Sequence, residues 1–304
     1  MNQIDSKIHA LIAEGEYSLA EGPHPERARL DAETLLLHVL RDNSQAGHKA
    51  WLTYHGITQN INSAWLIANR NLSTLPIISK NFKQLIMRRR VGEPIQYIMG
   101  ETEFYGLPFR VTSDVLIPRP ETEYLVEKVI ELAARFQQPR IVDVGTGSGA
   151  IAVALVRKLP HAQIAAIDIC SRALTIAREN AKHNGVDLRF ILGDLLMPVD
   201  GEKFEFVVSN PPYVPGTDRA TLSVEVRDYE PALALFAGDD GLDAYRRLIP
   251  AAFDALVPGG YVALEIGYGQ SKAITELLAR TGFEQIEFVP DLQGIPRVVC
   301  ARRP

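Results

Sequence analysis

The stretch "RIVDVGTGSGAIA", residues 140–152, decides the fold. A short apolar run typical of a buried strand ends in three glycines, and an apolar helical pattern follows at once. Gly145, Gly147 and Gly149 permit a tight turn and let a ligand lie against the backbone. The spacing also satisfies G-x-G-x-x-G/A, with Ala150 last, so a dinucleotide-binding fold is an open alternative.

The same unit, a strand followed by a helix, recurs towards the end of the chain. Alternation of this kind builds a mostly parallel sheet with helices on both faces, and it predicts a seven-stranded α/β domain. We expect its strands at residues 140–145, 163–169, 189–194, 204–210 and 261–267, with a closing pair at 284–291 and 296–303.

The residues before this domain follow other patterns. Apolar residues at helical spacing predict a helical domain over residues 1–94. Alternation with glycines and aromatics predicts a β-hairpin linker over residues 95–117, and the α/β domain then occupies residues 118–304. Residues 43–80, rich in Asn and Ser, are assigned only as weakly helical, and their role stays open.

Composition narrows the class of protein. A 304-residue chain with a net charge of −5 argues against a protein that coats nucleic acid, which needs clustered Lys and Arg. The one basic cluster, Arg88 to Arg90, is either a solvated helix end or a patch that faces a partner. Cys170 and Cys300 cannot build a disulfide framework or a usual zinc site, which favours a reducing cytosol. The pattern predicts neither a signal peptide nor a membrane span.

Acidic side chains follow the ends of three predicted strands. Asp168 can accept hydrogen bonds from both hydroxyls of a ribose, and Asp194 from the amino group of an adenine ring. Asp143 can hold the amides of the glycine loop or meet the amino group of a ligand. Each acid also has a plain structural interpretation as a turn, cap or loop residue. Because such strand ends meet at one edge of a sheet, we expect a ligand there.

The fourth strand ends in "SNPPYV", residues 209–214, where two prolines prevent the strand from continuing. The Asn210 side chain and a proline carbonyl offer two acceptors at a fixed separation. A planar –NH₂ group presents two donors at a matching separation, so both can be bound at once. Tyr213 can stack on the same flat group. A bare turn before a Pro-Pro stop is the plain structural alternative.

An amide or exocyclic amine nitrogen is a poor nucleophile, because its lone pair is delocalised. Two carbonyl acceptors raise its electron density and stabilise the positive charge that develops as a methyl group arrives. A carboxylate in that position would meet two carbonyl oxygens, so the site should distinguish glutamine from glutamate. The segment thus predicts methyl transfer to an adenine or a glutamine.

At this point the residues resemble a known family. "DVGTGSGAIA" followed by "SNPPYV" is similar to amino-methyltransferases that use S-adenosylmethionine. Four further motifs resemble, more narrowly, the peptide chain release factor glutamine methyltransferases of the HemK family. They are "GEPIQYIMGETEFYG", "VLIPRPETE", "RDYEPALALFAGDDGLDAYRRL" and "LEIGYGQ". The resemblance runs from about residue 90 to the C-terminus, and the helical N-terminal part matches more loosely.

The resemblance implies a Rossmann-like class I methyltransferase domain that uses S-adenosyl-L-methionine, forms S-adenosyl-L-homocysteine and needs no metal. Many members carry an aromatic residue after the adenine-site acid. This chain has Leu195 there, so apolar packing is expected and stacking on adenine is open. The candidate cofactor residues are Asp143, Gly145, Thr146, Gly147, Ser148, Gly149, Asp168, Asp194, Leu195 and Asn210.

The resemblance also implies that the enzyme methylates N5 of the glutamine in the Gly-Gly-Gln motif of class 1 release factors. The helical domain would recognise this substrate. The enzyme would act as a cytoplasmic monomer that binds neither nucleic acid directly nor a membrane. Arg119 and Glu121 could close over the cofactor or the tripeptide, or form a salt bridge at a helix start. The candidate substrate-binding residues are Asn210, Pro211, Pro212 and Tyr213, of which Asn210, Pro211 and Tyr213 are the candidate catalytic residues.

Other activities stay open at this stage. A ribosomal protein glutamine or adenine N6 in DNA presents the same amine geometry. Adenine methyltransferases usually need a target-recognition region and a basic face, for which this acidic chain leaves little room after Tyr213. An NAD-dependent oxidoreductase would leave Asn-Pro-Pro-Tyr unexplained. A non-catalytic module that senses S-adenosylmethionine is a further class.

Overall fold

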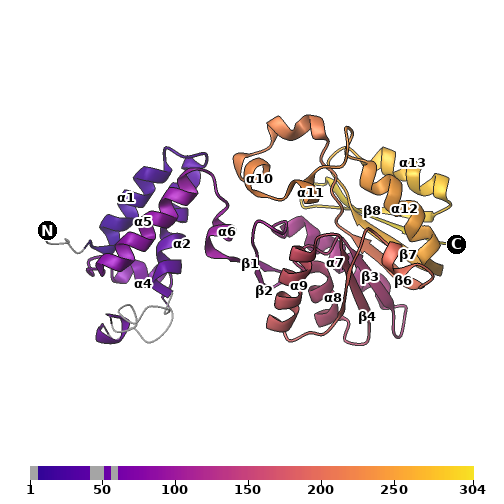
Figure 1. The fold of residues 1–304 in the computed structure, drawn as a ribbon, viewed down its shortest axis with the longest axis horizontal. Helices are drawn as coiled ribbons and strands as arrows, with labels where there is room; N and C mark the ends of the chain where they lie inside the picture. The colour runs from indigo at the N-terminus through magenta and orange to yellow at the C-terminus, as the bar shows by residue number, and fades with distance from the viewer. Residues whose placement is uncertain (1–5, 42–50, 56–60) are drawn as a thin grey trace. The chain divides into compact units, whose positions relative to one another are not determined.

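The computed structural model describes residues 6–41, 51–55 and 61–304 (Figure 1). The chain divides into two compact units. The helical unit comprises residues 1–99 together with 224–229, and the sheet unit comprises residues 100–223 and 230–304. The chain therefore passes between the units three times, after residues 99, 223 and 229.

The helical unit is built around α1 (Ile8–Leu19), α2 (Ala28–Arg41) and α5 (Pro76–Arg90). The apolar stripes of these helices face inward, with Leu11, Leu35 and Phe82 almost fully buried, as the helical spacing predicts. Shorter helices complete the unit: η1 (Pro25–Arg27), α4 (Ser63–Ala68), α6 (Ile95–Met99) and α10 (Val224–Tyr229).

Two sequence predictions for this part concern residues 43–80 and residues 95–99. Of the stretch 43–80, residues 43–50 and 56–60 lie outside the described residues, and part of the remainder forms α4 and the start of α5. Residues 95–99 form the short helix α6, where the sequence predicts the beginning of a hairpin. Their apolar side chains Ile95 and Ile98 pack into the helical core instead.

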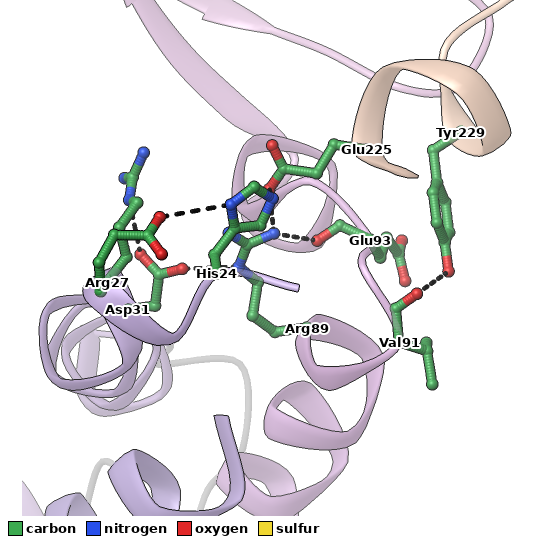
Figure 2. A network of polar contacts seen from close by, with 9 residues as sticks. His24, Arg27, Asp31, Arg89, Val91, Glu93, Glu225 and Tyr229 are labelled. Carbon is green, nitrogen blue, oxygen red and sulfur yellow. Dashed lines mark hydrogen bonds and ion pairs between the residues drawn. The ribbon is translucent and has the colours of Figure 1, made fainter. Parts of the chain in front are cut away.

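A buried ion network lies within the helical unit (Figure 2). Arg89 is 3% exposed and Asp31 is 2% exposed, and Arg89 Nε donates a hydrogen bond to Asp31 Oδ2 over 2.6 Å. Arg89 Nη1 donates to the backbone carbonyl of Glu93 over 3.0 Å and to the Glu225 carboxylate. The buried guanidinium therefore has acceptors on α2, on the turn after α5 and on α10.

The other two arginines of this cluster are also paired inside the helical unit. Arg88 forms an ion pair with Glu93, and Arg90 forms one with Glu21. Arg89, between them, is buried. The solvated helix end expected from the sequence therefore describes Arg88 and Arg90, which are partly exposed in the last turn of α5, whereas Arg89 is buried in the ion network.

The short helix α10 belongs to the helical unit although the chain reaches it from the sheet unit. Tyr229 donates its hydroxyl hydrogen to the Val91 carbonyl over 3.3 Å, and His24 Nε2 lies 3.3 Å from Glu225 Oε1 (Figure 2). Periodicity cannot predict this placement, because a helix of six residues is too short to show an apolar pattern that identifies its distant partners.

The sheet unit begins with a β-hairpin of β1 (Glu101–Phe104) and β2 (Leu107–Arg110). Its two turn residues, Tyr105 and Gly106, have φ of 54° and 70°. Positive φ at both positions is typical of the type I′ turn, whose twist matches that of the paired strands. The hairpin that the sequence predicts is therefore present, over a shorter range.

The main sheet has seven strands in the order β5-β4-β3-β6-β7-β9-β8. β9 runs antiparallel to β7 and β8, and the pairs among β5, β4, β3, β6 and β7 are all parallel, which confirms the predicted mostly parallel sheet. The strands are β3 (Arg140–Val144), β4 (Gln163–Asp168), β5 (Arg189–Leu192), β6 (Phe204–Ser209), β7 (Leu256–Glu265), β8 (Glu284–Pro290) and β9 (Pro296–Arg302).

Helices cover both faces of this sheet (Figure 1). Successive strand residues point to opposite faces, so Ile141 and Val142 belong to separate apolar clusters. One cluster includes α7 (Glu123–Ala133), α8 (Ala150–Lys158) and α9 (Ser171–His183), and the other includes α12 (Asp243–Ala255) and α13 (Ser271–Thr281).

Short helices occupy loops of the sheet unit: η2 (Pro120–Thr122), η3 (Met197–Val199), η4 (Gly216–Thr221) and α11 (Ala232–Leu235). Among the helices within the described ranges, none is both long and apolar enough to cross a membrane. The neighbouring parallel strands β3, β4, β5 and β6 end at the same edge of the sheet, which is where open α/β sheets bind ligands.

Candidate active site

The glycine loop between β3 and α8 has the backbone shape that its sequence predicts. Gly145, Gly147 and Gly149 have φ of 72°, 55° and 82°, values that residues with side chains rarely adopt. A Cβ on Gly145 or Gly147 would meet open space. One on Gly149 would lie 3.1 Å from the Ala177 Cβ, so this glycine allows close packing of α8 on α9. The first two glycines therefore leave the backbone accessible to a ligand.

Asp143 lies beneath this loop. Its side chain is fully buried, and Thr146 donates a hydroxyl hydrogen bond to Asp143 Oδ2 over 2.6 Å. Burial raises the pKa of Asp143 to about 7, the charge of nearby Asp168 adds to the rise, and the Thr146 bond opposes it. The contact with Thr146 ties Asp143 to the glycine loop through a side-chain hydroxyl, and a contact of Asp143 with the amino group of a ligand stays a prediction.

Asp168 ends β4 and its carboxylate bridges two backbone amides. Gly147 N–H donates to Oδ2 and Cys170 N–H donates to Oδ1, each over 2.8 Å. Burial raises the pKa of Asp168, and these amide bonds oppose the rise. Each carboxylate oxygen can accept more than one hydrogen bond, so both retain capacity for the hydroxyls of a ligand.

A cavity of about 340 Å³ opens at this edge of the sheet. Its volume is within the range of small-molecule sites. Three predicted residues, Asp143, Gly149 and Tyr213, are not part of its wall. The predicted residues that line it are Gly145, Thr146, Gly147, Ser148, Asp168, Asp194, Leu195, Asn210, Pro211 and Pro212.

Sequence reasoning missed several parts of the cavity wall. They comprise residues of the segment 113–118 that precedes "RPETE", Thr122, residues of the segment 169–173, and residues of the segment 231–234 with Ala244 and Arg247. Arg247 donates a hydrogen bond to Asp194 Oδ2, so the predicted adenine-site acid is already ion-paired. The next residue, Leu195, has a φ of 49°, a strained value for leucine, and contributes an apolar surface to the wall.

Asn210 follows β6 directly and lies at the cavity wall. Ser209 Oγ donates to the Val144 carbonyl over 2.6 Å and so ties the end of β6 to the end of β3. Asn210 Nδ2 donates to Thr122 Oγ1 over 3.2 Å. Nothing in the described part of the chain donates to Asn210 Oδ1, which leaves this oxygen as an acceptor at the cavity.

Tyr213 is held at both of its polar ends. Its hydroxyl donates to Glu265 Oε1 over 3.3 Å, and its carbonyl accepts a hydrogen bond from Gln270 Nε2 over 3.0 Å. Burial raises the pKa of Tyr213, and the charge of Glu265 adds to the rise. The tyrosine therefore stays neutral and its ring position is determined from two sides.

Glu265, at the end of β7, is a buried acid that the sequence reasoning did not single out. It is 2% exposed, and Thr122 donates a hydroxyl hydrogen bond to its Oε2 over 2.6 Å. Burial raises its pKa to about 7, against the hydrogen bonds from Thr122 and Tyr213. The available signal was an acid placed after the apolar run "YVAL", at the same sheet edge as Asp168 and Asn210.

Arg119 forms an ion pair with buried Glu230, which precedes Pro231 of the cavity wall. This salt bridge differs from the helix-start one considered from the sequence, because its partner lies 111 residues away. Closure of Arg119 over the cofactor or the tripeptide stays a prediction. Glu121 contributes to the electrostatics of the site, since its charge helps to raise the pKa of Glu265.

Within the described residues, no three His, Cys, Asp or Glu side chains are grouped so that they could hold a metal ion.

Comparison with known proteins adds independent information. The profile of the family described as "Methyltransferase small domain" matches residues 121–226, and that described as "PrmC N-terminal domain" matches residues 10–100. The release factor glutamine methyltransferase of Koribacter versatilis is 44% identical over 224 residues, which cover 73% of this chain and 79% of that protein. The one of Moorella thermoacetica is 41% identical over 299 residues, 97% of this chain and 98% of that protein.

Among solved structures, the T. thermophilus 16S rRNA N2 methyltransferase (RsmC), in complex with AdoMet and guanosine, is similar with a TM-score of 0.51. It is 18% identical, and the match covers 67% of this chain and 50% of that chain. At this identity the likeness concerns the fold alone.

Proposed function

Because the chain belongs to the release factor glutamine methyltransferases, we propose that Asn210 binds the substrate glutamine beside a cavity for S-adenosyl-L-methionine. The observation that carries this proposal is the Asn210 amide. Its Nδ2 is already bound to Thr122, so Oδ1 is the atom left to accept from a substrate. The target is N5 of the glutamine in the Gly-Gly-Gln motif of class 1 release factors.

The cavity residues fit the cofactor. The backbone of the glycine loop is accessible at Gly145 and Gly147, where a Cβ would meet nothing. Asp168 would accept from the ribose hydroxyls, and Leu195 would give the adenine an apolar surface. When bound, S-adenosyl-L-methionine supplies an electrophilic methyl group and is converted to S-adenosyl-L-homocysteine.

Asn210 Oδ1 and the Pro211 carbonyl would accept the two N–H groups of the glutamine amide. These acceptors orient the nitrogen and stabilise the positive charge that grows on it during methyl transfer. Pro211 and Pro212 have no backbone N–H, so the corner offers no competing donors from these positions. Tyr213 would stack on the amide plane, and a glutamate would be rejected by the two carbonyl oxygens.

We further propose that the helical unit takes part in recognising the release factor and that the enzyme acts as a cytoplasmic monomer without binding nucleic acid directly. The match of residues 10–100 to a family-specific N-terminal domain supports the first point. The net charge of −5 and the pairing of Arg88, Arg89 and Arg90 with acids support the last one.

A labelling experiment tests the proposed reaction. Purified release factor should receive label from tritiated S-adenosylmethionine on the Gly-Gly-Gln glutamine, and a release factor with Gln→Glu at that position should not. Equal labelling of the two, or preferential labelling of a competing ribosomal protein or DNA, would contradict the proposal.

Asn210→Ala should lower kcat about 10³-fold, because it removes an interaction that strengthens in the transition state, while cofactor affinity changes less.

A further inference from the structure

The motif "LEIGYGQ", residues 264–270, surrounds the substrate corner without lining the cavity. Glu265 binds the Thr122 and Tyr213 hydroxyls, and Gln270 binds the Tyr213 carbonyl. Gln270 is itself oriented, because its Oε1 accepts from the Gly267 N–H over 2.9 Å. The motif therefore holds Tyr213 directly and reaches Asn210 through Thr122.

The direction of these hydrogen bonds follows from the chemistry of Glu265. An ionised carboxylate can only accept, so both hydroxyls must point their hydrogens towards it. Thr122 then has only oxygen lone pairs to offer on its other side. The group that approaches there is the Asn210 amide, and a lone pair selects its Nδ2–H over its Oδ1.

This selection matters because the two ends of an asparagine amide have nearly the same shape. Rotation by half a turn would exchange Oδ1 and Nδ2 with little change in packing. The Nδ2–H groups would then face the N–H groups of the substrate amide, donor against donor. A corner that binds an –NH₂ group therefore needs a means of holding Oδ1 towards the substrate.

We propose that Glu265, acting through the Thr122 hydroxyl, is the positioning residue that keeps Asn210 Oδ1 facing the substrate glutamine. The inference rests on the proposed function of Asn210. It assigns no contact with substrate to Glu265, which lies at the buried end of the chain Glu265–Thr122–Asn210.

Protonation of Glu265 would remove the directionality, because a carboxylic acid can donate to Thr122 and free the hydroxyl hydrogen to turn towards Asn210. Burial raises the pKa of Glu265 to about 7, so this change falls within the working pH range. The charge of Glu121 also raises the pKa, and that of Arg297 lowers it. Two neutral phenols are nearby: Tyr213 binds the carboxylate, and Tyr245 donates to the Glu265 backbone carbonyl over 2.7 Å.

Three variants test the chain of bonds. Thr122→Val removes the hydroxyl at nearly constant shape, Thr122→Ser retains it, and Glu265→Gln replaces the acceptor-only group by one that also donates. We expect Thr122→Val and Glu265→Gln to lower kcat about 10- to 100-fold, with Thr122→Ser within about threefold of the wild type. The dissociation constant for S-adenosylmethionine and the melting temperature serve as controls for the cavity and the fold.

The pH profile separates positioning from mere support of the fold. Wild-type kcat should fall as the pH decreases through about 7, because protonated Glu265 no longer directs Thr122, and Glu265→Gln should lack this fall. Any of three results would overturn the proposal. Thr122→Val could retain the kcat of the wild type, Thr122→Ser and Thr122→Val could lose kcat equally, or Glu265→Gln could keep the wild-type dependence of kcat on pH.

One readout does not depend on the reaction, so a failure of the proposed function can be told from a failure of this inference. The Asn210 side-chain amide gives a resolvable NMR signal in selectively labelled protein. Its protons should exchange faster with solvent in Thr122→Val than in the wild type or Thr122→Ser. An unchanged exchange rate would overturn the positioning role even if the wild type methylates release factor. If the amide protons of Asn210 exchange faster in Thr122→Val but the wild type does not methylate release factor, the proposed function is rejected and the positioning role is retained.

Discussion

Two buried acids in this molecule, Asp31 in the helical unit and Glu265 in the sheet unit, are equally hidden from solvent but have different partners. Each is 2% exposed. Asp31 accepts from the guanidinium of Arg89, a full positive charge. Glu265 accepts from two neutral hydroxyls, and within the described residues no lysine, arginine or histidine forms an ion pair with it.

The difference separates a contact that maintains the fold from one that serves a site. The buried carboxylate of Asp31 forms an ion pair with the Arg89 guanidinium, and this pair joins α2 to α5. A buried carboxylate that meets only hydroxyls is costly to ionise, and burial raises the pKa of Glu265 to about 7. Strongly perturbed acids of this kind are concentrated at functional sites, where the cost is retained for the sake of chemistry.

The largest effect on stability is expected at the charged pair. Arg89→Met should lower the free energy of unfolding by about 3–5 kcal/mol, because it leaves the buried Asp31 carboxylate without its main counter-charge. Urea unfolding measures the change, and hydrogen exchange should localise it to α2, α5 and α10. The matched control is Arg88→Met, whose ion pair with Glu93 is partly exposed and should be worth less than about 1 kcal/mol. If the two substitutions lower the free energy of unfolding equally, the buried pair contributes no more to stability than the partly exposed pair, which contradicts the prediction.

Removing the charge of Glu265 should change the free energy of unfolding in the opposite direction, towards higher stability. The ordinary pKa of a glutamate is 4.5 and the folded-state pKa is about 7, so between these values the folded protein binds more protons than the unfolded one. Stability that depends on Glu265 therefore falls as the pH rises through this window, by about 3 kcal/mol in total. Glu265→Gln should be more stable than the wild type at about pH 8 and equal to it near pH 4.5.

Thermal unfolding at the two pH values checks this expectation. Combined with the predicted loss of kcat, it would make Glu265→Gln a variant that gains stability and loses activity. If Glu265→Gln is less stable than the wild type at about pH 8, then Glu265 stabilises the fold as Asp31 does, and the contrast between the two acids is wrong.

The smallest effect is expected from the Tyr213 hydroxyl, the second of the two hydroxyls that donate to Glu265. Tyr213→Phe removes only the 3.3 Å hydrogen bond to Oε1 and leaves the Thr122 branch intact. The hydrogen bond from Tyr213 lowers the pKa of Glu265, so its removal should shift the acid limb of the kcat–pH profile to higher pH. At about pH 8 we expect less than a tenfold loss of kcat. A shift to lower pH would mean that the hydroxyl does not donate to Glu265.

The sheet was predictable from sequence because its signals are local. Apolar runs ending in glycine or proline predict β3 and β6, and helical spacing predicts the helices that cover the sheet. The predicted glycine loop and the predicted acid Asp168 come together because the topology brings adjacent strand ends to one edge.

The features that sequence reasoning missed depend on pairs far apart in the chain. Thr122 and Glu265 are 143 residues apart, and Arg89 and Glu225 are 136 residues apart. No local period or spacing marks such a pair, and the type of residue does not say whether an acid will meet a cation or a hydroxyl. The motifs "RPETE" and "LEIGYGQ" supported the family resemblance, but their contact with one another became visible only in the structure.

The position of α10 in the chain has a consequence for biosynthesis. Arg89 leaves the ribosome with Asp31 already made, whereas Glu225 follows 136 residues later. At a synthesis rate of about 5–20 residues per second, the delay is roughly 7–27 seconds. During that interval the helical unit lacks one of its own helices, and most of the sheet unit is translated before it is supplied. The contacts of Arg89 and Val91 with α10 can therefore form only after most of the sheet unit has been translated.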